Sequence, residues 1–177
     1  TKVNSEKILL NELPELSTAV LRASTAYGMA ARIRFDLLLH QFIYEAWEKK
    51  QINLYGANSW RPMVHVDDIA RAIISVLTQH HKMKKKDVFN VGSNEQNFQK
   101  ITLAKMVSER FDVGISEIES KNDPRDYKVS FDKIKSELGY YTIHKPQESI
   151  EQIASALESG LINNRILHES VNIKPEN

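Results

Sequence analysis

Residues 21–28 read Leu-Arg-Ala-Ser-Thr-Ala-Tyr-Gly, and this stretch decides the fold. It begins as the end of an aliphatic, β-branched run at residues 18–21, which is typical of a buried strand, and continues as a polar loop of small residues. Further short apolar runs alternate with segments of helical periodicity, which predicts an α/β or α+β fold. The predicted strands are residues 18–21, 52–55, 63–66, 88–91 and 115–118, and the predicted helices are residues 2–13, 35–49, 69–77, 102–111, 133–138 and 149–158.

Length and composition limit the classes of protein to consider. The chain has 177 residues, enough for one domain or for a small domain with a fragment of another. Its formal net charge of +1 gives no reason to expect a nucleic-acid partner, and the lysines between residues 82 and 86 fit a solvated loop better. No apolar run approaches the ~20 residues that span a bilayer, so we predict no membrane association.

The chain has no cysteine and no signal-peptide pattern. Without thiols, disulfides and thiolate metal sites are excluded, which fits a cytoplasmic protein. Residues 1–7 include no initiator methionine, and the chain reads as though it were cut from a longer one. The tail at residues 163–177 lacks periodicity, and we expect it to be loose.

Arginines occur in the loops that flank the predicted strands. The guanidinium group matches the oxygens of phosphate or carboxylate, so several loop arginines suit an anion-binding site. A single loop arginine is more often solvated or paired with a neighbouring carboxylate, and from these residues alone both interpretations stay open. The arginines concerned are Arg32, Arg34, Arg61 and Arg125.

The segment Arg-Pro-Met-Val-His-Val-Asp-Asp at residues 61–68 holds further polar side chains. Asp67 and Asp68 could form an acid/base pair or bind a metal, but the helical run behind them favours the start of a helix. His65 lies between two valines on a predicted strand, which favours a hydrogen-bonded core histidine over a catalyst. We therefore predict no metal site in this chain.

The spacing of the glycines excludes one common kind of site. The six glycines are scattered, and none forms a Gly-x-Gly-x-x-Gly turn or a phosphate loop. This chain alone therefore does not offer a dinucleotide the glycine-rich turn at a helix amino terminus.

Several segments together resemble the carboxy-terminal half of extended short-chain dehydrogenases that act on nucleotide-activated sugars. The similarity runs from Lys2 to about Gly160, and two departures from the family pattern stand out. Ala30 and Ala31 replace the Ser-Pro of one branch, and Thr25 stands where the family often has asparagine. The matching segments are residues 21–28, 30–37, 61–72, 89–92 and 125–140.

The resemblance implies an α/β fold, namely the C-terminal part of a Rossmann-type extended short-chain dehydrogenase with a small mixed α/β substrate-binding cap. Residues 1–30 would be the last helix and strand of the NAD(P)-binding Rossmann domain. Residues 31–162 would form the substrate-binding region, with a strand at residues 88–92 returning to the Rossmann sheet.

The resemblance also implies roles for individual residues. Lys2 would be the catalytic, cofactor-binding lysine of the family's Tyr-x-x-x-Lys pair, with the tyrosine, the general acid/base, three residues before Thr1. Ser24 and Ala26 would border the nicotinamide, and Thr25 would contact the substrate. The nucleotide diphosphate would be held by Arg61 and Arg125, with Arg32 and Arg34 as further candidates.

The implied activity of the complete protein is that of an NAD- or NADP-dependent nucleotide-sugar epimerase, dehydratase or 4-dehydrogenase, which transiently removes hydride from the sugar. Its partner would be a nucleotide-diphosphate sugar, and homodimers are usual in the family. The alternative is a non-catalytic module that binds nucleotide sugars and lacks the cofactor half.

Overall fold

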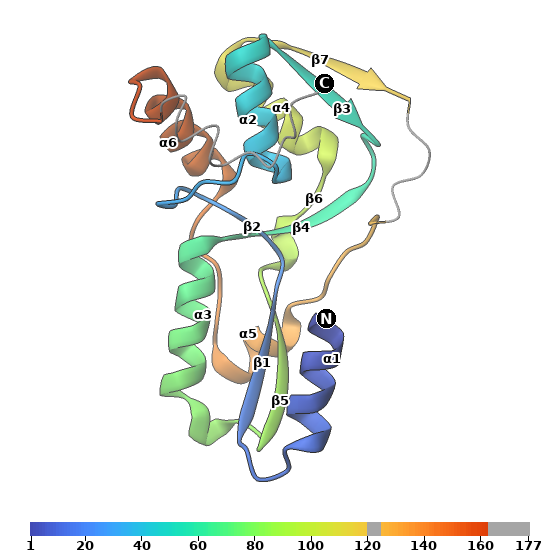
Figure 1. Ribbon diagram of the computed structural model, residues 1–177, viewed down its shortest axis with the longest axis vertical. Helices are drawn as coiled ribbons and strands as arrows, with labels where there is room; N and C mark the ends of the chain where they lie inside the picture. Colours follow the sequence, from blue (N-terminus) through green and yellow to red (C-terminus); the bar gives the residue numbers. More distant parts are fainter. Residues whose placement is uncertain (120–124, 163–177) are drawn as a thin grey trace.

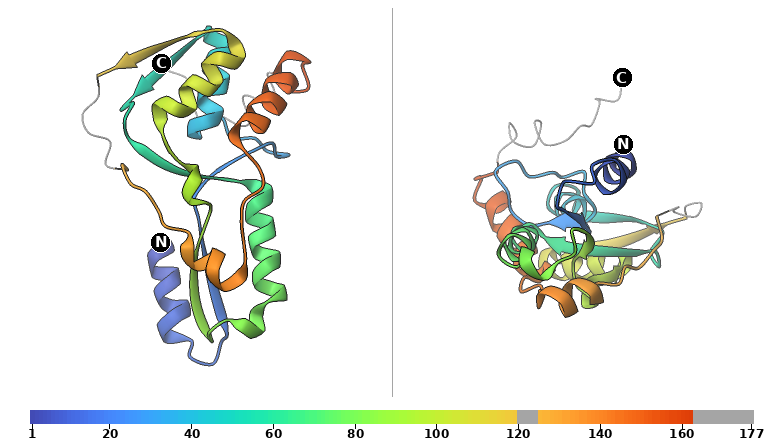
Figure 2. Two further views of the ribbon diagram at one scale, coloured as in Figure 1. Left: turned by 180° about the vertical axis from the view of Figure 1, so that it is seen from behind. Right: turned by 90° about the horizontal axis from the view of Figure 1, so that it is seen from below.

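The computed structural model describes residues 1–119 and 125–162, and the predicted tail lies outside them. The molecule is elongated, with a lower and an upper region, each with its own hydrophobic core (Figure 1; Figure 2). Short, mainly parallel strands alternate with helices in both regions. The predicted α/β class is thus confirmed.

The lower region is built on two parallel strands, β1 (Thr18–Ala23) and β5 (Lys86–Val91). Their register runs from Thr18 opposite Lys86 to Ala23 opposite Val91. Every second residue of β5 is buried, as expected for a strand with helices packed against it. The buried core residues of this region are Val64, Ala72, Val76, Phe89, Val91, Phe131, Ile134, Leu138 and Tyr140.

Helices cover the two strands of the lower region. α1 (Lys2–Lys7), which continues as a π-helical segment at Ile8–Glu12, and α3 (Val66–Thr78) lie on opposite sides of them (Figure 1). α5 (Asp132–Leu138) packs on β5. β5 thus lies beside β1, as expected for the predicted strand at residues 88–92, while the domain boundaries around it stay a prediction.

The upper region is mainly helical. α2 (Leu38–Lys49) packs against α4 (Lys100–Phe111) and α6 (Pro146–Glu158). β3 (Gln51–Tyr55) and β7 (Gly114–Ile118) form a parallel pair at its edge. The largest side chains buried there come from the helices and from β3, and they include Leu39, Ile43, Ile52, Leu54, Leu103 and Ile153.

A three-stranded sheet lies between the two regions. β4 (Trp60–His65) is its central strand, paired in parallel with β2 (Thr25–Tyr27) and antiparallel with β6 (Asn97–Gln99). Short 3₁₀ turns at His80–Lys82 and Asn94–Gln96 complete the fold. None of the helices in the described part of the chain is long and apolar enough to cross a membrane.

The predicted strands and helices are present, with shifted ends. The largest difference is β2, which lies in the segment predicted as a polar loop. Its small residues carry little strand propensity, and pairing with β4 decides their conformation. Four helices begin two or three residues away from their predicted starts, at Leu38, Val66, Lys100 and Pro146.

The start of α3 also differs in detail from its prediction. His65 is the N-cap, and its side chain accepts the N–H of Asp67. Asp67 and Asp68 lie in the first turn, where negative charge is favoured by the helix dipole. The prediction that His65 is a hydrogen-bonded core histidine is confirmed, because only 5% of the residue is exposed.

A buried carboxylate holds the connection between α5 and α6. Asp68 is fully buried, and its oxygens accept the N–H of Ile143 at 3.1 Å and that of His144 at 3.1 Å. Arg71 Nη1 donates to it at 2.8 Å, and the hydroxyl of Tyr140 donates to its backbone carbonyl at 2.9 Å. The segment that leads into α6 is therefore fixed against the first turn of α3.

We expect Asp68→Ala to destabilise the protein by about 3 kcal/mol, because two backbone N–H groups and Arg71 lose a buried acceptor. Urea unfolding with EDTA present measures the change. The control is Asp67→Ala. The Asp67 side chain is 68% exposed, so this substitution should lower the free energy of unfolding by less than about 1 kcal/mol. Equal losses in the two variants would contradict this account.

Candidate functional site

The carboxyl ends of β1 and β5 lie side by side and form one part of the site. Ser24 follows β1, and its N–H donates to the carbonyl of Val91 at 3.1 Å. Gly92 follows β5, and a Cβ at this position would lie 3.1 Å from Ser24 Oγ and 2.6 Å from the ring of Phe131. Open parallel sheets bind ligands at the carboxyl ends of their strands, so this edge is where a ligand is expected.

Lys2 lies toward the same edge. It is exposed in the first turn of α1, whose amino end points toward the carboxyl ends of β1 and β5 (Figure 1). Two contacts hold the helix along the strands: Arg22 Nε donates to Glu6 Oε2 at 3.0 Å, and Lys86 Nζ donates to the carbonyl of Leu9 at 2.7 Å. The position of the Lys2 backbone is therefore set by the packing of the whole helix.

Thr25 and Ala26 lie on β2, opposite Met63 and Val64 of β4, and both are half-buried. The next residue, Tyr27, is buried, and its hydroxyl donates to Gln96 Oε1 at 2.9 Å. Burial, with the Asp68 carboxylate nearby, raises the pKa of Tyr27 well above its usual value. Tyr27 therefore stays protonated at neutral pH, which suits the hydrogen bond that it donates to Gln96.

Two histidines contact the sharp turn after β2: His40 through a hydrogen bond and His65 by close packing. Gly28 has φ +120°, and a Cβ there would lie 2.5 Å from Nε2 of His65. The Gly28 N–H donates to Nε2 of the buried His40 at 3.1 Å, and His40 Nδ1 lies 3.0 Å from the carbonyl of Arg34. His40 thus joins the two ends of the segment that carries Arg32 and Arg34.

The second part of the site lies at the start of β4. The buried Arg61 donates through Nη1 to the carbonyl of Trp60 at 2.8 Å and to the carbonyl of Arg125. The Trp60 N–H donates to Asp126 Oδ1 at 2.7 Å, and Lys128 Nζ lies 3.5 Å from the centre of the Trp60 ring. The structure thus brings two predicted residues, Arg61 and Arg125, together with Lys128.

Arg32 and Arg34 are both exposed on the segment between β2 and α2. Arg34 forms a double contact with Asp36, in which Nε lies 3.0 Å from Oδ1. The Arg34 guanidinium lowers the pKa of Asp36, so this carboxyl stays charged. The positive charge of Arg34 is therefore matched within its own loop, which weakens its case as an anion-binding residue.

Two residues of the site carry no predicted role. Lys128 lies in the segment that the sequence marks through Arg125, so its position three residues later is a signal that could have found it. No sequence signal points to His40, which lies in an amphipathic helix and makes its contacts only in the folded chain.

The described part of the chain is a Rossmann-type α/β protein, with polar residues at the carboxyl ends of its parallel strands. A sequence profile of the NAD dependent epimerase/dehydratase family matches residues 1–92. The chain therefore belongs to this family of enzymes, as the resemblance implied.

Solved structures share the fold at low sequence identity. RMD from Pseudomonas aeruginosa, complexed with NADPH, is 17% identical with a TM-score of 0.75, and the match covers 89% of this chain and 55% of that one. The dTDP-glucose 4,6-dehydratase of Bacillus anthracis, in complex with NAD, is 20% identical with a TM-score of 0.75, and the match covers 93% of this chain and 53% of that one. The UDP-glucose 4-epimerase of Thermotoga maritima, with UDP-glucose, is 20% identical with a TM-score of 0.73, and the match covers 90% of this chain and 52% of that one. The chain spans about half the length of the structures it matches.

We expect Gly28→Ala to destabilise the protein by at least about 2 kcal/mol, because both the backbone and the His65 ring would have to move. Urea unfolding tests this. Gly114→Ala is the matched control, since a Cβ at Gly114 meets no atom within 4 Å and should change stability by about 0.5 kcal/mol or less. Similar losses of stability in both variants would show that the close approach of Gly28 to His65 does not make a side chain at this position costly.

We expect the stability of the protein to fall in mild acid partly through His40. Burial lowers the pKa of His40, and His65 acts in the same direction, while the Arg34 carbonyl and Asp36 oppose the shift. The unfolded chain therefore binds more protons, so stability falls as the pH drops below the unfolded value of about 6.5.

The variant His40→Gln isolates this effect, because a glutamine oxygen can still accept the Gly28 N–H. Urea unfolding at about pH 7.5 and about pH 5.5 should show a larger loss for the wild type than for the variant. A difference between the two proteins that does not change with pH would refute the assignment.

Proposed function

We propose that this chain provides the substrate-binding part of an NAD(P)-dependent nucleotide-sugar epimerase, dehydratase or 4-dehydrogenase. The observation that carries the proposal is the gathering of Arg61, Arg125 and Lys128 at the start of β4. Thr25 is nearby, because it pairs with Met63, two residues along β4 from Arg61. The complete protein would be a cytoplasmic homodimer.

A nucleotide diphosphate suits this group of cations. The guanidinium of Arg61 is held by two backbone carbonyls, so it is preorganised to meet phosphate oxygens. The segment that contacts the start of β4 carries two basic residues, Arg125 and Lys128, and one acidic residue, Asp126, so together with Arg61 the local charge is positive. The hydroxyl of Thr25 can exchange hydrogen bonds with a sugar hydroxyl.

The residues present fit one end of NAD(P). At the strand ends, beside Ala26, Ser24 offers a hydroxyl and Gly92 has no side chain. The exposed Lys2 can reach ribose hydroxyls from α1. The glycine-rich turn that holds the cofactor's pyrophosphate is not in this sequence, so another segment has to supply it. Bound NAD(P) would accept hydride from the sugar, while the protein orients the substrate.

The surface of the lower region supports a further α/β unit beside it. On α3, Ile73, Ile74 and Leu77 are 46%, 59% and 67% exposed, and on α1 Val3 is 66% exposed. Apolar side chains gathered on one helix face usually meet a partner. In the described part of the chain β1 pairs with β5 alone, so its other edge is open to a further strand.

The second candidate is a non-catalytic nucleotide-sugar-binding module. The observation that favours it is the scattered spacing of the glycines, which denies this chain a phosphate-binding turn. The two candidates differ in hydride transfer. Expression together with any in-frame coding sequence found before Thr1, followed by product analysis with UDP-, dTDP-, GDP- and ADP-sugars, separates them, because the module would bind a sugar nucleotide without converting it.

We expect Arg125→Ala to weaken binding of the preferred sugar nucleotide by about 10-fold to 100-fold, because a charge-assisted hydrogen bond to phosphate is lost. Isothermal titration measures the affinity. Arg22→Ala is the matched control, since this arginine is similarly exposed but pairs with Glu6 on α1. Unchanged affinity in Arg125→Ala, or an equal loss in Arg22→Ala, would contradict the proposed diphosphate site.

A further inference from the structure

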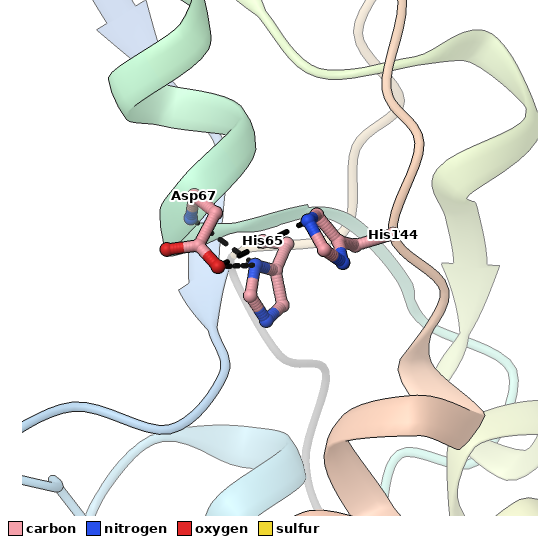
Figure 3. Close-up of side chains that lie close together, drawn as sticks. All are labelled: His65, Asp67 and His144. Carbon is pink, nitrogen blue, oxygen red and sulfur yellow. Dashed lines mark hydrogen bonds and ion pairs between the residues drawn. The ribbon is translucent and has the colours of Figure 1, made fainter.

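Three side chains from two distant segments meet beside the start of α3 (Figure 3). Nδ1 of His65 lies 3.7 Å from Oδ2 of Asp67, and Nε2 of His144 lies 3.9 Å from the same oxygen. The two imidazole rings are stacked, with centres 4.2 Å apart and 27° between their planes, so one ring has to rotate before both nitrogens can face a single ion. One nitrogen of each ring and one carboxylate oxygen all lie within 4.8 Å of one another.

We propose that His65, Asp67 and His144 bind one divalent transition-metal ion such as Zn²⁺. Two imidazole nitrogens and a carboxylate oxygen suit zinc, nickel or copper, whereas magnesium and calcium prefer sites made of oxygen alone. Ligand atoms on a tetrahedral zinc ion lie roughly 3.4 Å apart, so the nitrogen–oxygen distances of 3.7 Å and 3.9 Å need contractions of about 0.3 Å and about 0.5 Å. The distance between the two nitrogens, which is within 4.8 Å, has to reach the same value. Asp67 is exposed to solvent, so water can take the fourth position.

The contacts around the two rings assign a hydrogen-bonding role to one nitrogen of each ring. Nδ1 of His65 accepts the N–H of Asp67 at 3.1 Å, so this nitrogen is unprotonated, its lone pair is engaged by that hydrogen bond, and the ring proton is on Nε2. Nδ1 of His144 lies 3.3 Å from Glu148 Oε2, which can only accept when ionised. The proton of His144 is therefore on Nδ1, and its Nε2 faces Asp67.

The contact of Glu148 with His144 is the second observation that supports the site. A carboxylate on the far nitrogen of a histidine ligand fixes the ring and makes it more basic, and this arrangement accompanies most histidine ligands of metals. Glu148 lies in the first turn of α6, one helical turn beyond His144. It would act as a positioning residue and not as a ligand.

The cluster is also largely held in place by the fold. The carboxylate of Asp68 accepts the backbone N–H of His144, and the ring of His65 packs edge-on against Tyr27 with ring centres 5.3 Å apart. Binding would cost one existing bond, because the metal replaces the Asp67 N–H at Nδ1 of His65. In return it would join α3 of the lower region to the segment that leads into α6.

The test uses the full chain, treated with EDTA and dialysed, and titrated with ZnCl₂ in a calorimeter. We expect one ion per chain, with the affinity lowered at least about 100-fold by His144→Gln and by about 10-fold to 100-fold by Glu148→Gln. Asp67→Asn is a further ligand variant, and its exposed side chain makes loss of folding no explanation for lost binding. Circular dichroism checks the fold of each variant.

The control is a triple variant in which His80, His81 and His168, the three histidines of the sequence other than His40, His65 and His144, are all changed to glutamine. It should bind zinc as the wild type does. Replacing zinc by Co²⁺ should give a visible absorption spectrum of a low-coordinate ion, which His144→Gln removes. Absence of saturable binding, unchanged binding in His144→Gln and Asp67→Asn, or loss of binding in the triple variant would each overturn the proposal.

Discussion

The fold depends most on one buried carboxylate, Asp68. A charged group without exposure is tolerated only when hydrogen bonds satisfy it, and here two backbone N–H groups and Arg71 do so. Because the two N–H groups belong to the segment after α5, this one side chain fixes how the chain passes from the lower core to the upper one. The positions of His144 and of the start of α6 follow from it.

The candidate site lies where the chain passes between sheets. β1 ends at Ala23 and β2 begins at Thr25, so Ser24 is the single residue between a strand of the lower pair and a strand of the central sheet. Beside it, the backbone of Gly92 lies so close to Phe131 that a Cβ there would be 2.6 Å from the ring. A residue in this position has its backbone fixed by two sheets, which suits a site that must hold a ligand precisely.

Much of the fold could be predicted from the sequence, because its strands and helices have strong local patterns. The helix that became α3 has apolar residues on one face, and β5 alternates buried and partly buried residues. β2 could not be predicted, since its conformation comes from pairing with β4.

The same limit applies to the candidate site. Arg61 and Arg125 stand out as arginines near predicted strands, and the fold brings them together. His40 and His144 show no such signal, because each acts through residues that are distant in the sequence. His144 is 79 positions from His65, since 144 − 65 = 79, and only the packing around Asp68 brings the rings together.

The pairing of β1 with β5 has a consequence for how the protein folds during synthesis. Thr18 pairs with Lys86, which lies 68 residues later, since 86 − 18 = 68, and the intervening chain includes α2, β3, β4 and α3. At roughly 5–20 residues per second the ribosome needs several seconds to supply this partner. Until then β1 lacks this partner, and the edge that later pairs with β5 is open to other strands over this interval.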